Sequence, residues 1–271
     1  MYQALYRKWR PKTFSQVVGQ DHITGTLQRQ VAEGRTAHAY LFTGTRGTGK
    51  TTCARILAKG VNCLHPEDGA PCNQCEACRG IDSGSLLDVT ELDAASNNGV
   101  DNIRDLRDEA NFTPAVGKYR VYIIDEAHML STGAFNALLK IMEEPPAHVV
   151  FILATTEVHK IPATILSRCQ RFDFYRIPRD AIASRLEYIA GKEGFTVTRE
   201  AAELIAGLSD GALRDAISLL DLCSSYSREI TRDTVLEASG TVGTGHLYDL
   251  ADAAADGDTA RALAIAGELS R

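Results

Sequence analysis

The segment GTRGTGKT, residues 44–51, constrains the fold of this chain more than any other feature. It fits the pattern G-x-x-x-x-G-K-[S/T], in which backbone N–H groups cradle phosphates at the N-terminus of a helix. That chemistry requires a strand before the loop and a helix after it. The apolar run AYLFTG precedes the loop and a helical pattern begins at about Lys50, so both conditions are met. The sequence therefore predicts a nucleotide-binding fold built from strands and helices.

The residue types within this loop suit a nucleotide's phosphates and a magnesium ion. The three glycines permit close approach of the backbone, Lys50 would neutralise the β- and γ-phosphates, and Thr51 would bind Mg²⁺. The candidate cofactor-binding residues of the segment are Gly44, Thr45, Arg46, Gly47, Thr48, Gly49, Lys50, Thr51 and Thr52.

A second motif supports the first. The apolar run VYIID leads into two adjacent carboxylates, Asp125 and Glu126. At the end of a buried strand, Asp125 would lie near the magnesium ion and Glu126 would polarise an attacking water molecule. We interpret His128, two residues further on, as a solvated loop residue.

Strand and helix patterns alternate over the first two thirds of the chain. We expect strands at 39–44, 86–92, 119–125 and 149–156, and helices at 21–34, from about 50, at 100–110 and at 133–144. Such alternation predicts a parallel sheet covered by helices on both faces. After Pro178 the patterns are helical only, with Leu213, Ile217 and Leu220 on one face, which predicts a small helical domain. Residues 241–245 are interpreted as a linker.

Four of the seven cysteines cluster with C-x8-C-x2-C-x2-C spacing, and the candidate metal ligands are Cys63, Cys72, Cys75 and Cys78. This spacing lets two tight turns aim sulfurs at one tetrahedral point, which favours a closed structural zinc site. Free thiols and an iron–sulfur cluster are the alternatives, because C-x2-C-x2-C also occurs in ferredoxins. His65 is a substitute ligand to consider, but four thiolates already complete the shell. Cys53, Cys169 and Cys223 are expected to be small core residues.

Composition limits the classes of protein that remain. The 271 residues are 44% hydrophobic and 24% charged, as in ordinary globular chains. No apolar run approaches the roughly 20 residues that span a bilayer, and the N-terminus lacks a signal-peptide core, so we expect a cytoplasmic protein without a membrane partner. A net charge of -6 argues against a surface that coats nucleic acid everywhere, although a local basic strip remains compatible with it.

Together these motifs resemble the AAA+ clamp-loader ATPases of bacteria, the gamma/tau subunits of DNA polymerase III. The resemblance covers nearly the whole chain and rests on LYRKWRPKTFSQVVGQ, the glycine loop, the cysteine insert, LDAASNNGVDNIRDL, IIDEAHML, NALLKIMEEPP, ATTEVHKIPATILSRCQRF and GALRDAISLLD. It implies an α/β AAA+ P-loop fold with a five-stranded parallel sheet, a zinc-binding insert and a helical lid. The implied domains are 1–178 for nucleotide binding with the zinc module at 63–78, 179–241 for the lid, and 242–271 for the start of a truncated helical collar.

The resemblance also implies roles for residues outside the two motifs. Arg10, Pro11 and Val18 would line the adenine pocket for ATP. Thr156, at the end of the run FILATT, would be the first sensor, and Arg214 in GALRDA would be the second, reaching the γ-phosphate from the lid. A strand-end threonine can instead satisfy backbone groups, and an arginine that begins a helix can pair with an exposed neighbour.

Arg168 lies in ILSRCQRF, just before what we expect to be a short strand. By the resemblance it projects at the edge of the module opposite the glycine loop, out of reach of its own ATP. In a ring it would meet the γ-phosphate bound by the neighbouring subunit. The alternative is an ion pair that holds the loop within its own subunit.

The resemblance implies the ATPase motor subunit of the replicative clamp loader, which loads the sliding clamp on primed DNA within the polymerase holoenzyme. ATP, Mg²⁺ and Zn²⁺ are the expected cofactors, and other clamp-loader subunits, the clamp and primed DNA are the expected partners. A nucleotide-bound, non-hydrolysing scaffold subunit is the alternative, and a helicase is disfavoured because the sequence has a single glycine loop. Nothing in the sequence suggests a polymerase site of its own. Phosphate contacts to DNA are expected near Asn98, Gly99, Arg104 and Lys140.

Overall fold

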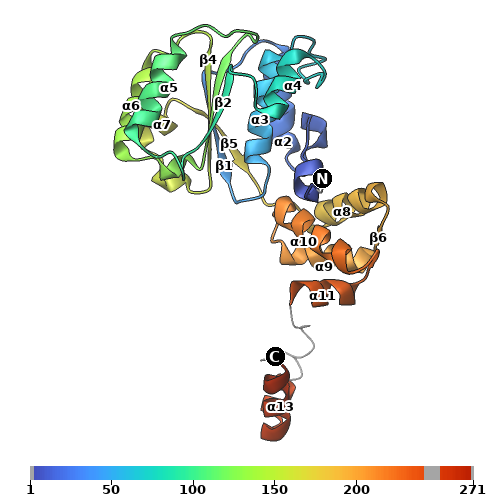
Figure 1. The fold of residues 1–271 in the computed structure, drawn as a ribbon. Helices are drawn as coiled ribbons and strands as arrows, with labels where there is room; N and C mark the ends of the chain where they lie inside the picture. Colours follow the sequence, from blue (N-terminus) through green and yellow to red (C-terminus); the bar gives the residue numbers. More distant parts are fainter. Residues whose placement is uncertain (1–2, 241–250, 270–271) are drawn as a thin grey trace.

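The computed structural model describes residues 3–240 and 251–269. A five-stranded, fully parallel sheet forms its centre, with the strand order β2-β3-β4-β1-β5 (Figure 1). The strands are β1 (Ala39–Gly44), β2 (Val89–Asp93), β3 (Arg120–Asp125), β4 (Val149–Thr155) and β5 (Gln170–Phe174). The predicted five-stranded parallel sheet is confirmed.

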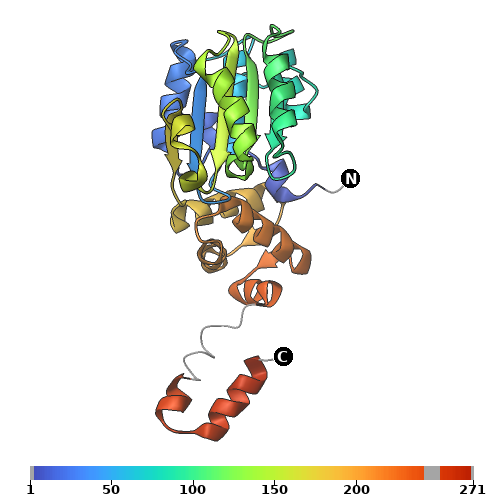
Figure 2. The same cartoon turned by 90° about the vertical axis from the view of Figure 1, so that its left-hand side faces the viewer.

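Helices cover both faces of the sheet, as expected (Figures 1 and 2). One face carries α5 (Val100–Ala110), α6 (Thr132–Glu143) and α7 (Ala163–Leu166), and the other carries α2 (Asp21–Ala32) and α3 (Lys50–Asn62). Side chains alternate between the two cores along each strand. In β1, Leu41 packs toward α5 and α6, while Tyr40 and Phe42 pack toward α2 and α3.

Most predicted elements begin and end close to where the structure has them, and β1 and α5 agree at both ends. The strand expected at 86–92 is an exception, because β2 begins only at Val89. Leu86 is buried instead among the cysteines of the insert, against α4 (Glu76–Ser83). Short 3-10 turns complete the sheet domain: η1 (Phe14–Gln16), η2 (Ala127–Met129) and η3 (Val158–Lys160).

A helical lid follows the sheet, formed by α8 (Arg179–Glu193), α9 (Arg199–Leu208), α10 (Leu213–Tyr226) and α11 (Arg232–Ser239). Ile217 and Leu220 are buried on the predicted face of α10. The prediction that strands end at Pro178 is wrong, because β6 (Thr196–Val197) and β7 (Glu229–Ile230) form a short parallel pair. Strands of two residues are too short to show an alternating pattern in the sequence.

The N-terminal segment packs against the lid rather than against the sheet alone. In α1 (Leu5–Lys8), the backbone N–H of Leu5 donates to Asp221 Oδ2 at 2.9 Å. The indole Nε1 of Trp9 donates to Glu193 Oε1 at 2.7 Å. Residues that precede the sheet therefore connect it to the lid.

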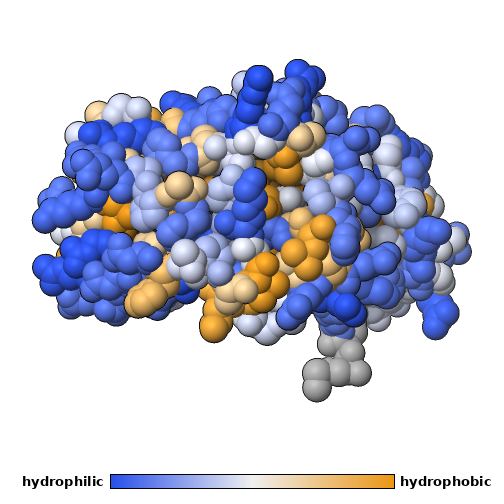
Figure 3. All heavy atoms as spheres, turned by 90° about the horizontal axis from the view of Figure 1, so that it is seen from above, coloured by the Kyte–Doolittle hydropathy of each residue, from blue (hydrophilic) through white to orange (hydrophobic). Residues whose placement is uncertain are grey.

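The surface seen from above in Figure 1 is mainly hydrophilic, with a few apolar patches (Figure 3). Leu87 and Phe112, which precede β2 and β3, are 78% and 68% exposed. The C-terminal helix α13 (Thr259–Leu269) follows a short helical stretch at 251–255. The linker predicted at 241–245 lies outside the described residues. Within the described ranges, every helix is too short or too polar to cross a lipid bilayer.

Candidate nucleotide and metal sites

The glycine loop joins β1 to α3 at the carboxyl edge of the sheet, where open α/β sheets bind their ligands. Gly44 and Gly47 have φ angles of +145° and +78°, which residues with a side chain rarely adopt. A Cβ atom at Gly44 would collide with the carbonyl oxygen of Phe174, and one at Gly47 would lie 2.8 Å from the Cβ of Ala212. The loop therefore requires glycine at both positions, and it contacts the lid directly.

Lys50 begins α3 and is buried beneath the loop. Its Nζ donates to the carbonyl oxygens of Gly44 and Thr45, both at 2.8 Å. Burial lowers the pKa of Lys50, while Glu126 and Asp125 act in the opposite direction. The ammonium group thus lies at the loop, among oxygens that a phosphate can replace as partners.

Thr51 and Asp125 meet as the sequence predicts. Thr51 Oγ1 donates to Asp125 Oδ2 at 2.7 Å. A hydroxyl and a carboxylate are hard oxygen ligands of the kind that Mg²⁺ binds beside nucleotide phosphates. The two residues therefore fit a magnesium ion.

Glu126 follows β3 with a left-handed backbone, φ 47° and ψ 44°. Such a conformation costs a non-glycine residue about 1–3 kcal/mol and persists only where the surroundings hold it. Its Oε2 accepts a hydrogen bond of 3.2 Å from Thr156 Oγ1. Because Thr155 pairs with Thr43 in the sheet, Thr156 lies beside the glycine loop. The structure thus brings the predicted water-polarising carboxylate and the predicted sensor threonine together.

The interpretation of His128 as a solvated residue is wrong, because its side chain is only 7% exposed. Its Nδ1 lies 3.1 Å from Thr155 Oγ1 and 3.5 Å from Glu126 Oε2. Its Nε2 lies 3.3 Å from Glu157 Oε1. The ring is enclosed because η2 folds directly after β3 against the end of β4, a contact that local sequence spacing does not show.

A cavity of about 930 Å³ extends from the glycine loop to the N-terminal segment and the lid. This volume is within the range of about 300–1,000 Å³ that is typical of ligand pockets. The predicted residues that line it are Arg10, Pro11, Val18, Arg46, Gly47, Thr48, Gly49, Lys50, Thr51, Thr52, Asp125, Glu126 and Arg214. Gly44 and Thr45 contact Lys50, and Thr156 contacts Glu126.

Two arginines from distant parts of the chain reach this cavity. Arg10 Nε donates to Thr52 Oγ1 at 3.2 Å. The guanidinium carbon of Arg214, at the start of α10, lies 4.9 Å from the ring centroid of Tyr6. This cation–π contact holds Arg214 beside the cavity. Tyr6 was not predicted as a site residue, and its signal in the sequence is an aromatic residue close to Arg10.

Arg168 lies between α7 and β5, at the amino-terminal edge of the sheet. The five residues of β5 separate this edge from the level of the glycine loop by about 16 Å, at about 3.3 Å per residue. Its guanidinium donates to Glu143 Oε1 at 3.0 Å and to the Thr164 carbonyl at 2.8 Å. The intrasubunit ion pair considered as an alternative therefore exists, and the side chain remains 33% exposed.

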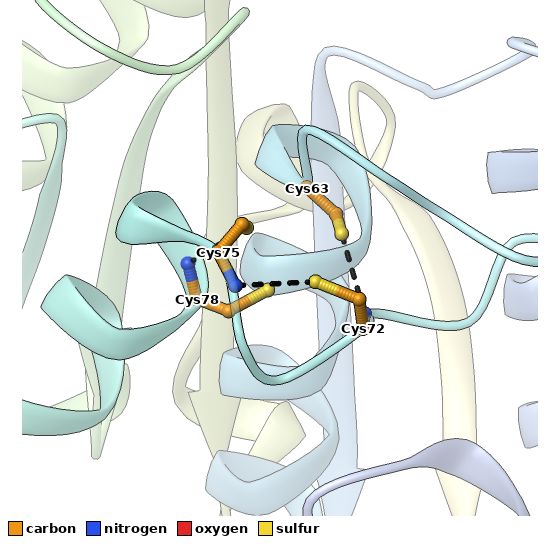
Figure 4. A group of neighbouring side chains, drawn as sticks. All are labelled: Cys63, Cys72, Cys75 and Cys78. Atoms are coloured by element: carbon orange, nitrogen blue, oxygen red, sulfur yellow. Dashed lines mark hydrogen bonds between the residues drawn. The ribbon is translucent and has the colours of Figure 1, made fainter.

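The four clustered cysteines converge as predicted, with all their Sγ atoms within 4.8 Å of one another (Figure 4). Backbone N–H groups support the sulfurs, as between Cys72 N and Cys63 Sγ at 3.2 Å. The N–H groups of Gln74 and Cys75 lower the pKa of Cys72 to about 6, whereas burial raises the pKa of Cys63 and of Cys78. Four cysteine sulfurs gathered in this way fit a closed tetrahedral zinc site. Among the described residues the cluster consists of these four thiols, and His65 is outside it.

One helix connects the cavity to the cysteines. Helix α3 begins at Lys50 and ends at Asn62, one residue before Cys63. Within it, the side chain of Lys59 is 3% exposed, and its Nζ donates to Asn73 Oδ1 at 2.7 Å and to Asp82 Oδ1 at 3.0 Å. This buried lysine connects α3 to the cysteine module, and it was not predicted from the sequence.

The residues proposed for DNA contact lie on the α5 and α6 side of the sheet. Gly99 is the N-cap of α5, so no side chain caps this helix end. The backbone carbonyl of Asn98 accepts a hydrogen bond from the backbone N–H of Ser131 at 3.1 Å. Arg104 is exposed and pairs with Asp101 at 3.0 Å, and Lys140 is exposed. Their role in DNA binding stays a prediction.

Comparison with known proteins places this geometry in a family. The model described as "DNA polymerase III, delta subunit" matches residues 19–178, and the one described as "DNA polymerase III clamp loader subunit, ATPase lid domain" matches residues 181–226. Solved structures of the RuvB Holliday junction branch migration motor of Thermotoga maritima share the AAA+ fold. One of them has a TM-score of 0.63 and 18% identity, and the match covers 90% of this chain and 79% of that one.

Curated relatives are more similar to this chain in sequence than the solved structures are. DNA polymerase III subunit tau of Bacillus subtilis is 54% identical over 99% of this chain and 48% of its own length. The tau subunit of Escherichia coli is 44% identical over 98% of this chain and 42% of its own length. This chain thus spans about half the length of the curated relatives it matches. Both family models and these relatives agree with the geometry of the nucleotide and cysteine sites. The chain therefore belongs to the gamma/tau clamp-loader subunit family of DNA polymerase III.

Proposed function

We propose that this chain hydrolyses ATP as the motor subunit of the replicative clamp loader, and that hydrolysis accompanies loading of the sliding clamp on primed DNA. The observation that carries the proposal is the assembly of Lys50, Thr51, Asp125 and Glu126 around one cavity, with Arg214 of the lid on its wall. A non-hydrolysing scaffold would need the glycine loop and Lys50, but not a carboxylate beside a sensor threonine.

In this proposal each side chain has a distinct task. The glycine loop and Lys50 bind the phosphates, and Thr51 and Asp125 hold Mg²⁺, which supplies positive charge beside the phosphate oxygens. Glu126, hydrogen-bonded to Thr156, orients a water molecule toward the γ-phosphate and accepts its proton. Arg10, Pro11 and Val18 contact the adenine, and Arg214 contacts the γ-phosphate.

Arg168 would act on the nucleotide of a neighbouring subunit. Its distance from its own loop and its exposure support this role, and the contact with Glu143 would have to be exchanged for the phosphate. The pair is partly exposed, and such pairs are worth only about 0–1 kcal/mol, so the exchange is not costly.

The remaining parts of the chain have supporting roles in the proposal. Residues 1–178 form the nucleotide-binding domain with the zinc module, 179–241 form the lid, and 242–271 begin a collar that joins subunits into a ring. The four cysteines hold a structural zinc ion and take no part in hydrolysis. Other clamp-loader subunits, the clamp and primed DNA are the proposed partners.

The direct test compares ATP turnover with ATP binding in the assembled complex. Glu126→Gln should lower kcat about 10²- to 10⁴-fold, because it removes the proton acceptor. The dissociation constant for ATP should change by less than about 3-fold, since Lys50 and the loop are intact. Glu144→Gln, at an exposed position, is the control. A wild-type complex that binds ATP without turnover would instead support the scaffold.

A further inference from the structure

We infer that His128 is a positioning residue that holds Glu126 in the orientation needed for hydrolysis, an inference that rests on the proposed ATPase function. The ring is buried and lies between two carboxylates, with Nδ1 facing Glu126 and Nε2 facing Glu157. It reaches Glu126 from the side, 3.5 Å from Oε2, and contacts no part of the cavity lining other than this carboxylate among the described contacts. His128 therefore acts through Glu126 rather than on the nucleotide.

The backbone at Glu126 explains why such a support is needed. Its left-handed conformation must be held by neighbours. The N–H of Glu126 donates to Asp125 Oδ1 at 2.9 Å, and Met129 N donates to the Glu126 carbonyl at 2.8 Å. Both bonds are internal to the segment 125–129, so they fix the shape of the turn but not its place against β4. Two side-chain contacts supply that connection: Thr156 Oγ1 donates to Glu126 Oε2 at 3.2 Å, and His128 Nδ1 lies 3.1 Å from Thr155 Oγ1.

The hydrogen bonds around Thr155 indicate how the ring is oriented. Thr155 Oγ1 accepts the backbone N–H of Glu157 at 3.0 Å, which leaves the hydroxyl hydrogen free to donate to His128 Nδ1. In this assignment Nε2 carries the ring hydrogen and faces Glu157 Oε1 at 3.3 Å. Both ring nitrogens then have a partner, Thr155 at Nδ1 and Glu157 at Nε2.

The surroundings of the ring fix its place beside Glu126. Glu157, which faces Nε2, also pairs with Lys160 at 2.9 Å. On its other side the buried ring packs against the Glu126 carboxylate and limits its rotation. His128 thus orients Glu126 for its proposed role.

The test is His128→Ala in the assembled complex, with His159→Ala as a matched control. His159 Nε2 lies 3.5 Å from the same Glu157, but its side chain is 72% exposed. His128→Ala should lower kcat about 10- to 100-fold through misplacement of Glu126, with the ATP dissociation constant unchanged. His159→Ala should leave both values as in the wild type. His128→Asn, which retains a polar group near Nδ1, should recover part of the rate, whereas His128→Leu should not.

Hydrogen exchange of the backbone amides at 126–130 gives a readout that does not depend on turnover. Exchange should be faster in His128→Ala than in the wild type and unchanged in His159→Ala, because His128, unlike the exposed His159, connects this turn to Thr155. If His128→Ala fails to fold, Thr155→Val carries the same expectations for kcat and exchange, since it removes the hydroxyl that the ring contacts.

Two results are decisive in different ways. Wild-type-like kcat and exchange in His128→Ala would overturn the positioning role, as would a loss of ATP affinity with unchanged kcat. Absence of turnover in the wild-type complex would refute the proposed ATPase function instead, and the exchange measurement would still report whether His128 holds the turn.

Discussion

The nucleotide cavity and the cysteine module are built in opposite ways, although α3 connects them. The cavity draws its residues from the N-terminal segment, the glycine loop, β3 and the lid, so it exists only when the whole fold is assembled. The cysteine module takes all four of its thiols from residues 63–78. The cavity depends on contacts between distant segments, so its shape can change when the lid moves. The cysteine module is local, and its loss should leave the cavity largely intact.

The largest expected effect concerns the local module. Cys75→Ser should abolish stoichiometric zinc, which contributes an apparent free energy of about 10–16 kcal/mol in zinc-finger peptides. Metal analysis should find one zinc per chain in the wild type, and in Cys223→Ala as a control with a cysteine lost from the lid. The ATP dissociation constant of Cys75→Ser should change by less than about 3-fold. Iron absorbance, or a wild-type chain without metal, would contradict the assignment.

The next effect concerns the assembled cavity. Lys50→Ala should weaken ATP binding by about 2–5 kcal/mol, because the phosphates lose a buried cationic partner. Titration with a fluorescent ATP analogue measures this directly. Zinc content should be unchanged, since the cysteines do not contact Lys50. Unchanged ATP affinity in Lys50→Ala would show that Lys50 is not the main partner of the phosphates.

Lys59→Met separates the two regions on one helix, because Lys59 lies on α3 like Lys50 but contacts the module. The change leaves Asn73 Oδ1 and Asp82 without their buried donor, so the free energy of unfolding should fall by about 1–3 kcal/mol. Urea denaturation measures the loss. If ATP affinity fell as much as in Lys50→Ala, the two regions would not be independent.

The smallest expected effect is a dependence of the free energy of unfolding on pH. It arises at Asp88, which directly precedes β2. Burial works against the ionised form of Asp88, but hydrogen bonds from the N–H groups of Gly117, Ala115 and Val116 outweigh it and hold its pKa below the usual value. This carboxylate therefore stabilises the fold above its unfolded-state pKa of about 3.9, and the stabilisation is lost as the pH falls through the lower folded-state value.

Urea denaturation at a series of acidic pH values tests this account of Asp88. Asp88→Asn should lose part of the pH dependence of the unfolding free energy in that range. Asp105→Asn, at an exposed position of α5, should retain it. Equal pH dependence in both variants would show that Asp88 contributes nothing measurable.

The same contrast explains what could be predicted from the sequence. The cysteine ligands, and Lys50, Thr51 and Asp125, follow from short motifs whose spacing determines their geometry. Strands such as β1 follow from a continuous apolar run between turn signals. In each case the information lies within a few residues of the feature it determines.

The features that were missed depend on contacts between distant segments. The burial of His128 needs Thr155 and Glu157 at the end of another strand, and the place of Arg214 needs the ring of Tyr6. Lys59 is an ordinary helix former in sequence, and its contacts with Asn73 and Asp82 of the cysteine region are what bury it. Such contacts have no local pattern, so a single sequence cannot show them.

The central claim is that each cavity is completed by Arg168 of a neighbouring subunit. Arg168→Ala subunits should bind ATP normally and hydrolyse it slowly, since an arginine supplied across an interface is worth about 10³- to 10⁵-fold in rate in other NTPases. Lys50→Ala subunits should bind ATP poorly. In mixed rings the two defective subunits should partly restore hydrolysis, wherever an intact Arg168 faces an intact Lys50. Absence of restored hydrolysis in rings shown to contain both subunits would contradict the claim.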